Sequence, residues 1–414
     1  MILLFIVLCK EVFVFFDGTW NNETSQTNIW RMFNYLNGTV ELNSFGGSHN
    51  VTSYIKKSHS PDRVALYLYG LGTSKDTLNN FVQAFSGFGI EGWVTVAYEF
   101  LIRYLEEHDT LRIFGFSRGA TSSRVLARYL GEYGIHEDNL VNRKIEYTLL
   151  EPSFPSVVGW IPEISFVGLF DSVRAISTIQ QAAAILRTQM RRLKKRSIEE
   201  SLIKILDTVV NTTSTTFNAI VQDYSDFFGK VAVMTNARKM IRYSDEMLGN
   251  VIEASHAVAI NEYRTMYNYS SIPTREGFQQ CYFTGAHTDI GGSYYSDRGL
   301  IALQWMLQQD GLSSVFSSDI LPKNYNGTAM ALNYTIYDSY LEPIVGFKTN
   351  TKFSQSLLPI FYRSFVKDPI FHPSVYVVAA KLNVTLRHTL NRTLILPFLR
   401  DLEHYNKDNM TVIF

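Results

Sequence analysis

Short apolar runs alternate along much of the chain with segments of helical periodicity, and this alternation predicts the fold. Runs typical of buried strands end in turns rich in Gly, Asp or Asn, and they lie at residues 11–16, 64–69, 111–114, 164–170 and 280–285. Apolar residues recur with helical spacing at 27–36, with Asn28 as the expected cap, and at 93–108, 120–130, 251–264 and 298–310. Residues 37–62 are polar and are interpreted as a loop. The alternation predicts an α/β fold, a mostly parallel sheet flanked by helices.

A Gly-x-Ser-x-Gly sequence, Gly115–Gly119, follows the third apolar run and precedes a helical segment. Strand, turn and helix form the context of a nucleophile elbow, which holds its serine at the tip of a strained turn. Glycines are needed there because a Cβ would collide with the neighbouring strand or helix. We predict that Ser117 is a nucleophile and that the backbone N–H of Arg118, at a helix N-terminus, donates to an oxyanion. The alternative is a structural turn, since the motif by itself arises by chance.

Two more candidates directly follow apolar runs. Asp171 ends the run at 164–170, where a triad acid and a helix N-cap are equally good interpretations of its position. His287 follows the run at 280–285 and opens a glycine turn, which frees its ring for general-base work at the edge of the sheet. The chain order Ser117, Asp171, His287 is the order of α/β-hydrolase triads.

Three other polar residues are weaker candidates. Asp17 ends the first apolar run, and ligand crevices of α/β sheets lie at the carboxyl ends of strands, although a surface turn is the alternative. Asp289 could orient His287 or bind a cation, but beside glycines it is more typical of a turn. His256 lies among apolar neighbours and is interpreted as a packed core histidine.

Residues 174–250 differ from the rest and are interpreted as a helical insertion within a single domain covering 1–414. Two amphipathic stretches lie there, and a basic cluster at 187–196 adjoins the polar face of the first. A basic amphipathic helix can contact an anionic membrane, so the insertion could act as a lid or membrane-contact subdomain. The alternative is a solvated helix face.

Composition excludes several functional classes. Apolar residues make up 46% and charged residues 18% of 414, which is enough for a large core. The net charge is zero and no basic field dominates, so nucleic acid is not an expected partner. The two cysteines, Cys9 and Cys281, provide neither a disulfide framework nor metal-site spacing, and we expect no metal or organic cofactor.

The start of the chain and its glycosylation sequons bear on localisation. Residues 1–9 are wholly apolar but too short to span a bilayer, and both a signal segment and a buried strand fit them. Asn-x-Ser/Thr triplets occur at ten positions, which favours a secreted or membrane-associated protein over a cytoplasmic one, although an Asn-rich genome would also produce them.

The chain resembles a known family over nearly its whole length. The matching blocks include FFDGTWN at 15–21, GLGT at 70–73, AYEFL at 97–101, GFSRGA at 115–120, GLFDSV at 168–173, HAVAINEYR at 256–264 and GAHTDIGGSY at 285–294. In this combination and order they resemble the α/β-hydrolase family that includes type VI secretion lipase effectors. The resemblance implies a triad of Ser117, Asp171 and His287, with the loop of Asp17, Gly18 and Thr19 as the second arm of the oxyanion hole.

The function expected from the residues and the resemblance together is ester hydrolysis by a serine hydrolase. The resemblance implies a phospholipase that acts on membrane glycerophospholipids. Two alternatives stay open: an esterase for short-chain or glycan esters, and a catalytically inert scaffold that binds lipid.

Overall fold

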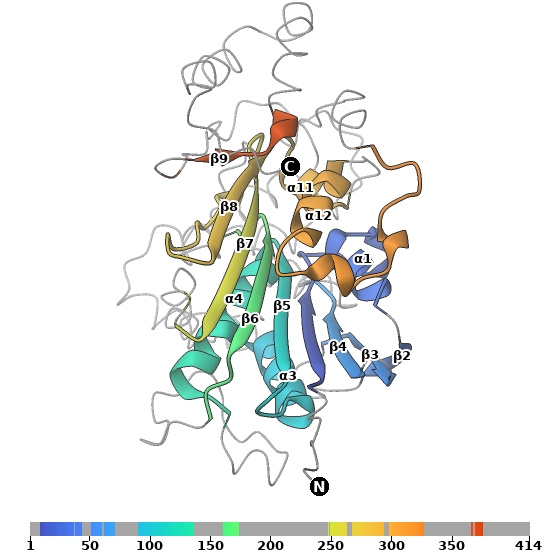
Figure 1. Ribbon diagram of the computed structural model, residues 1–414, viewed down its shortest axis with the longest axis vertical. Helices are drawn as coiled ribbons and strands as arrows, with labels where there is room; N and C mark the ends of the chain where they lie inside the picture. Colours follow the sequence, from blue (N-terminus) through green and yellow to red (C-terminus); the bar gives the residue numbers. More distant parts are fainter. Residues whose placement is uncertain are drawn as a thin grey trace, which may run out of the picture.

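A nine-stranded sheet forms the centre of the computed structural model, and helices cover both of its faces (Figure 1). The structure describes residues 9–36, 38–43, 51–59, 62–70, 90–135, 160–173, 247, 249–262, 267–293, 298–326, 366 and 369–375. Apart from residues 247, 249 and 250, the predicted insertion at 174–250 lies outside these ranges, as does its basic cluster at 187–196. Residues 1–8 and 71–73 also lie outside them. The single domain, the insertion and the membrane contact therefore stay predictions.

The strand order of the sheet is β2-β3-β4-β1-β5-β6-β7-β8-β9. Every neighbouring pair from β4 to β9 is parallel, whereas β2 and β3 form an antiparallel edge beside β4. The strands are β1 (Glu11–Phe16), β2 (Thr39–Asn43), β3 (Ser53–His59), β4 (Asp62–Leu68), β5 (Thr110–Phe116), β6 (Ile164–Phe170), β7 (Val251–Ala259), β8 (Phe278–Phe283) and β9 (Ile370–Phe371). The predicted mostly parallel sheet is confirmed, and all the predicted strands are present.

Strand β1 shows why the central strands are apolar on both faces. Its side chains alternate between two cores: Val12 and Val14 pack with α3 and α4 on one face, while Phe13 and Phe15 pack with α1 and α12 on the other. Because both faces are covered, the sequence is a continuous apolar run rather than an alternating one. The helices are α1 (Asn28–Asn34), α3 (Ile90–Tyr104), α4 (Arg118–Tyr133), α11 (His287–Gly291) and α12 (Arg298–Leu307).

The segment at 251–264 was predicted as a helix, and this prediction is wrong. Residues Val251–Ala259 form β7, which lies between β6 and β8 and pairs with both in parallel. Its carboxyl half is buried on both faces, and a short, fully buried strand cannot be distinguished from a buried helical turn by periodicity alone. His256 is fully buried in this strand, as expected of a core histidine.

Two further predictions are corrected at the antiparallel edge. The expected loop at 37–62 contains β2 and β3, whose polar composition suits strands at the edge of a sheet. The cap of α1 is Thr27, whose Oγ1 accepts from the N–H of Trp30 at 3.0 Å. Asn28 is instead buried, and its side-chain amide donates to the carbonyls of Ile290 and Gly299. It thereby joins α1 to α11 and α12.

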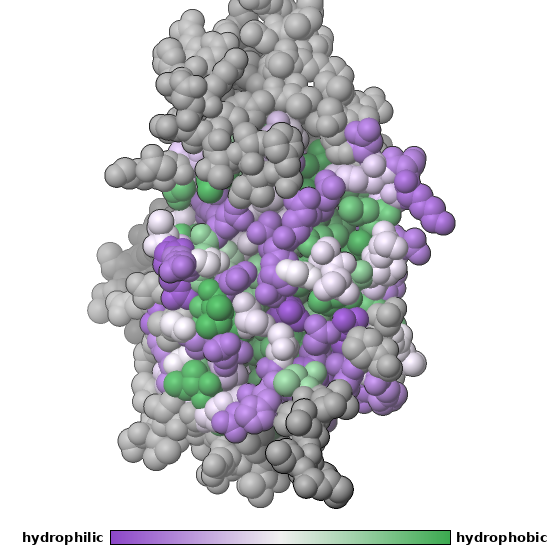
Figure 2. All heavy atoms as spheres, viewed as in Figure 1, coloured by the Kyte–Doolittle hydropathy of each residue, from purple (hydrophilic) through white to green (hydrophobic). Residues whose placement is uncertain are grey.

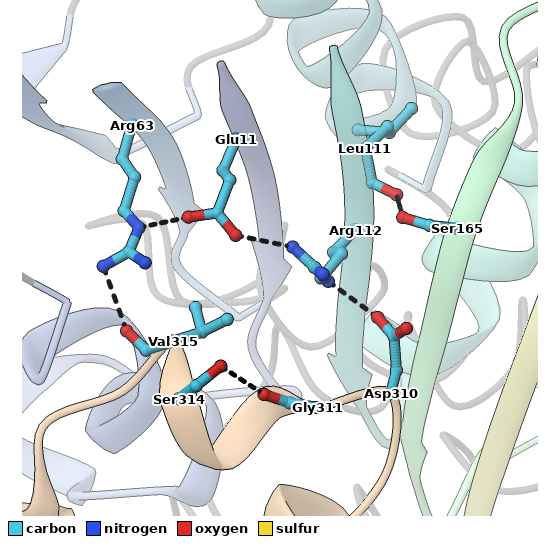
Figure 3. Close-up of polar contacts among 9 residues, drawn as sticks. All are labelled: Glu11, Arg63, Leu111, Arg112, Ser165, Asp310, Gly311, Ser314 and Val315. Atoms are coloured by element: carbon cyan, nitrogen blue, oxygen red, sulfur yellow. Dashed lines mark hydrogen bonds and ion pairs between the residues drawn. The ribbon is translucent and has the colours of Figure 1, made fainter. Parts of the chain in front are cut away.

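An ion-pair network closes the amino-terminal end of the sheet (Figure 3). The carboxylate of Glu11, on β1, pairs with Arg63 on β4 and with Arg112 on β5, the latter at 2.9 Å. Arg112 also pairs with Asp310 at 2.7 Å, and Arg63 donates to the carbonyl of Val315 at 3.1 Å. The network therefore fixes the starts of three adjacent strands to the segment that follows α12.

The described elements expose both polar and apolar side chains. Figure 2 shows polar and apolar side chains interspersed on one face. The exposed large hydrophobic residues of the described part lie apart in the sequence, at Val40, Ile161, Ile252 and Ile370. Within the described ranges, no helix combines the length and apolar character needed to cross a membrane.

Candidate active site

The sharp turn at Ser117 joins β5 to α4 at the carboxyl end of the sheet. Ser117 has φ 60° and ψ −123°, a conformation that side-chain-bearing residues rarely adopt. A Cβ on Gly119 would lie 2.2 Å from the carbonyl oxygen of Phe16, and one on Gly115 would lie 2.4 Å from the carbonyl oxygen of Gly119. Gly119 thus lets the turn pack directly on the end of β1, Gly115 lets β5 lie close to the start of α4, and the strained serine is held over the edge of the sheet.

Three side chains from separate strand ends form a continuous hydrogen-bonded chain. The distance from His287 Nε2 to Ser117 Oγ is 2.7 Å, and the distance from His287 Nδ1 to Asp171 Oδ2 is 2.6 Å. All three are buried, with 4% of Ser117, 3% of His287 and none of Asp171 exposed. The other carboxylate oxygen of Asp171 accepts from the N–H of Ala259 at 2.9 Å. This is the geometry in which a base can take the serine proton while a fixed carboxylate orients its ring.

The turn at Asp171 is positioned by neighbouring strands of the sheet. Its N–H donates to the carbonyl of Ala257 on β7 at 2.7 Å, and its φ is 43°. The next N–H, that of Ser172, donates to Nε2 of His256 at 3.0 Å. Nδ1 of His256 lies 3.0 Å from the amide oxygen of Gln280, which can only accept, so His256 is neutral with its proton on Nδ1. The core histidine therefore also holds the turn that presents the candidate acid.

Phe116, Tyr267 and Glu262 also contact His287, and none of them was predicted as a site residue. The rings of Phe116 and Tyr267 each have their centroids 4.8 Å from that of His287. The N–H of His287 faces Oε2 of the fully buried Glu262 at 3.3 Å. Phe116 lies inside the Gly-x-Ser-x-Gly motif and Glu262 inside the block HAVAINEYR, so both could have been inferred, whereas Tyr267 follows no motif and reaches the site only through the fold.

Asp17 anchors the loop after β1 and does not contact Ser117 or His287. Its carboxylate is fully buried and accepts from Tyr67 Oη at 2.5 Å, from Thr27 Oγ1 at 2.8 Å and from its neighbouring N–H, that of Gly18, at 2.7 Å. Burial raises the pKa of Asp17 to about 7, against the lowering effect of these hydrogen bonds. The structure therefore gives this candidate a supporting position beneath the site.

The same loop lies against the elbow, but its N–H groups differ in availability. Gly18 N–H is engaged by Asp17, so in this conformation it is not directed at an oxyanion above Ser117. Thr19 contacts the side chain of Arg118, because its Oγ1 accepts from Nη1 of Arg118 at 3.1 Å, and its own N–H makes no hydrogen bond within the described residues. Of the three residues expected to form the oxyanion hole, Arg118 and Thr19 thus remain the better-placed candidates through their backbone N–H groups.

Asp289 has a local role at the start of α11. Its Oδ2 accepts from the N–H of Ala286 at 2.9 Å, one turn before it, so it caps the short helix that begins with His287. This matches the turn-forming interpretation of the residue. Among the described residues, no group of three His, Cys, Asp or Glu side chains could hold a metal ion.

The family model described as the catalytic domain of Tle1-like type VI secretion phospholipase effectors matches residues 10–153 and 150–309. The chain belongs to this family. Its mostly parallel sheet flanked by helices is an α/β fold, and the Ser117, Asp171 and His287 arrangement lies entirely within the matched residues.

The chain is also similar, at low sequence identity, to individual proteins. An uncharacterized protein of Saccharomyces cerevisiae is 25% identical over 207 residues, which are 41% of this chain and 28% of the yeast protein. An uncharacterized protein from Pseudomonas aeruginosa of known structure aligns at 15% identity and a TM-score of 0.36, over 75% of this chain and 47% of that one. The structure of a Tle1 effector bound to the VgrG spike aligns at 18% identity and a TM-score of 0.33, over 70% and 52%. The chain thus spans about half or less of these proteins.

Proposed function

We propose that this Tle1-like family member is a serine carboxylic ester hydrolase that cleaves membrane glycerophospholipids. The observation that supports the proposal most directly is the hydrogen-bonded chain from Ser117 Oγ through His287 to Asp171, buried at the carboxyl end of the sheet. The family description supports the lipid ester as substrate. An exported or membrane-associated location and membrane contact through 187–196 belong to the same proposal.

In the proposed mechanism, neutral His287 accepts the proton of Ser117 through Nε2 as Oγ attacks the ester carbonyl carbon. The hydrogen bond from Nδ1–H to Asp171 Oδ2 fixes the required tautomer and stabilises the imidazolium that forms. The backbone N–H groups of Arg118 and Thr19 stabilise the oxyanion of the tetrahedral intermediate. His287 then protonates the departing alcohol, and it later activates the water that releases the fatty acid from Ser117.

The test is replacement of the nucleophile with a matched control. Ser117→Ala is expected to lower kcat for short-chain esters and for phospholipid vesicles by about 10⁴-fold or more, since a triad acts as a unit. Ser165→Ala is the control, because that hydroxyl, on β6, donates only to the carbonyl of Leu111 at 2.9 Å. Full activity of purified Ser117→Ala would refute the nucleophile assignment.

Two further measurements separate the proposed substrate from its alternatives. A fluorophosphonate probe should label the wild-type protein at Ser117, and absence of labelling would indicate an inert scaffold. Mass analysis of the products from mixed phospholipid vesicles should show released fatty acid and lysophospholipid. Hydrolysis of soluble short-chain esters without any vesicle products would instead assign the protein as a short-chain or glycan esterase.

A further inference from the structure

The guanidinium of Arg118 is buried beside the candidate nucleophile without an anionic partner. Only 3% of this residue is exposed. Nη1 donates to Thr19 Oγ1 at 3.1 Å, while Nε is buried and has no hydrogen-bond partner among the described residues. No carboxylate of the described part forms an ion pair with this side chain. Burial lowers the pKa of the guanidinium, but arginine stays charged in proteins, so a positive charge is held in the site.

Two other arginines of the described part have more partners for their charge or their N–H groups than Arg118 has. Arg112 pairs with two carboxylates, those of Glu11 and Asp310. Arg124 is fully buried and donates through both terminal nitrogens to the carbonyls of Ser270 and Ser271, although its Nε, like that of Arg118, makes no hydrogen bond within the described residues. An isolated buried charge is costly, and an unsatisfied buried donor is rare in folded proteins. The Arg118 guanidinium therefore lacks the anionic partner that a bound ligand could supply.

The position of the guanidinium places that ligand within the acyl-transfer site. Arg118 directly follows Ser117, and its side chain donates to the hydroxyl of Thr19, a residue of the loop proposed as the second oxyanion arm. The phenol of Tyr267 lies near the guanidinium, and its ring packs on the ring of His287. A group bound to Arg118 would thus lie next to the serine, the base and the oxyanion donors.

We propose that the Arg118 side chain is an anion subsite that binds the phosphodiester of the substrate while Ser117 attacks the neighbouring ester carbonyl. A planar guanidinium matches phosphate oxygens with two parallel N–H donors, and Nε supplies one of the donors that the protein leaves unpaired. In a glycerophospholipid only a few bonds separate the phosphate from the ester carbonyls, so both groups reach adjacent positions. The subsite rests on the proposed ester hydrolysis and adds a specific requirement, namely selection of phosphate-bearing over neutral glycerol esters.

The experiment compares two soluble substrates with the same acyl chains, dibutyroylphosphatidylcholine and tributyrin. Arg118→Gln is expected to lower the ratio of kcat/KM for the phospholipid to that for tributyrin by about 10- to 100-fold, the effect of losing a charge-assisted hydrogen bond. Arg118→Lys, which keeps the charge but not the paired donors, should recover part of the ratio. The control is Arg128→Gln, on the same helix and paired with Glu132 at 2.6 Å, which should leave the ratio unchanged.

A ratio unchanged in Arg118→Gln, or an equal loss on both substrates, would overturn the subsite. Fluorophosphonate labelling of Ser117 separates this result from failure of the proposed function, because a labelled and active enzyme with an unchanged ratio retains the hydrolase assignment.

A measurement on the wild type covers the case in which Arg118 variants do not fold. Glycerol 3-phosphate should inhibit tributyrin hydrolysis competitively at concentrations at which glycerol does not. Inhibition by inorganic phosphate as strong as that by glycerol 3-phosphate would indicate a site for the free ion and would refute selection of the lipid headgroup.

Discussion

The buried carboxyl of Asp17 makes a sharp prediction about how stability depends on pH. Burial raises its pKa from 3.8 to about 7 in the folded protein. In the unfolded chain the group has its ordinary pKa, so between these two values the folded state binds a proton that the unfolded state does not. Its contribution to stability is therefore complete below about pH 4 and is lost as the pH rises to about 7. A shift of about three pKa units corresponds to about 4 kcal/mol.

The perturbation is Asp17→Asn, which imitates the protonated carboxyl. The amide oxygen can accept from Gly18 N–H, while the amide N–H groups face the hydroxyls of Tyr67 and Thr27, which can rotate and accept. The variant should keep its fold and lose the proton uptake. Between pH 4.5 and 7.5 its free energy of unfolding should fall less steeply than that of the wild type, and it should be the more stable protein at pH 7.5.

Equilibrium unfolding in urea, followed by tryptophan fluorescence at several pH values, measures the difference in slope. Asp62→Asn, which removes an exposed carboxylate from β4, controls for the change in net charge. If wild type and Asp17→Asn have parallel profiles over this pH range, Asp17 is ionised in the folded protein at acidic pH. Its three hydrogen bonds would then outweigh the effect of burial, and the reasoning would be refuted.

Two further predictions concern the candidate acid and the ion-pair network. Asp171→Asn should lower kcat by about 10⁴-fold with little change in KM, because an amide N–H facing Nδ1 of His287 favours the wrong tautomer of the histidine. Steady-state kinetics on a short-chain ester measures this effect. A loss in kcat of less than about tenfold would contradict the role of Asp171 as the triad acid. Glu11→Ala should lower the free energy of unfolding by about 1–3 kcal/mol, since it leaves two partly buried arginines without their shared carboxylate. Urea unfolding measures this loss, and kcat should be unaffected because the network lies at the opposite end of the strands.

The sequence by itself predicted the parallel sheet, because its central strands are buried on both faces and are therefore continuous apolar runs. It also indicated Ser117, since a strained turn between a strand and a helix needs glycines at fixed positions around the serine. His287 was indicated in the same way, by a polar residue directly after a buried strand. These features are local, and each can be recognised within a few residues of the chain.

Other features depend on contacts between segments that are distant in the chain. Periodicity could not distinguish the β7 strand from a helix, because β6 and β8 bury both of its faces. The position of Asp171 in the sequence fits a triad acid and a helix cap equally well, and only the fold shows that its carboxylate lies 2.6 Å from Nδ1 of His287. The hydrogen bond from Tyr67 to the Asp17 carboxylate, and the lack of a carboxylate partner for the Arg118 guanidinium among the described residues, likewise follow from packing across the carboxyl ends of the strands.

There is a physical reason why the sequence predicts some of these features and only the tertiary structure decides the others. Strand burial and turn strain are properties of short segments, so they leave a pattern in the residue types. Hydrogen-bond partners and the desolvation of a charge are set by which strand ends meet at one edge of the sheet, and only the tertiary structure decides that.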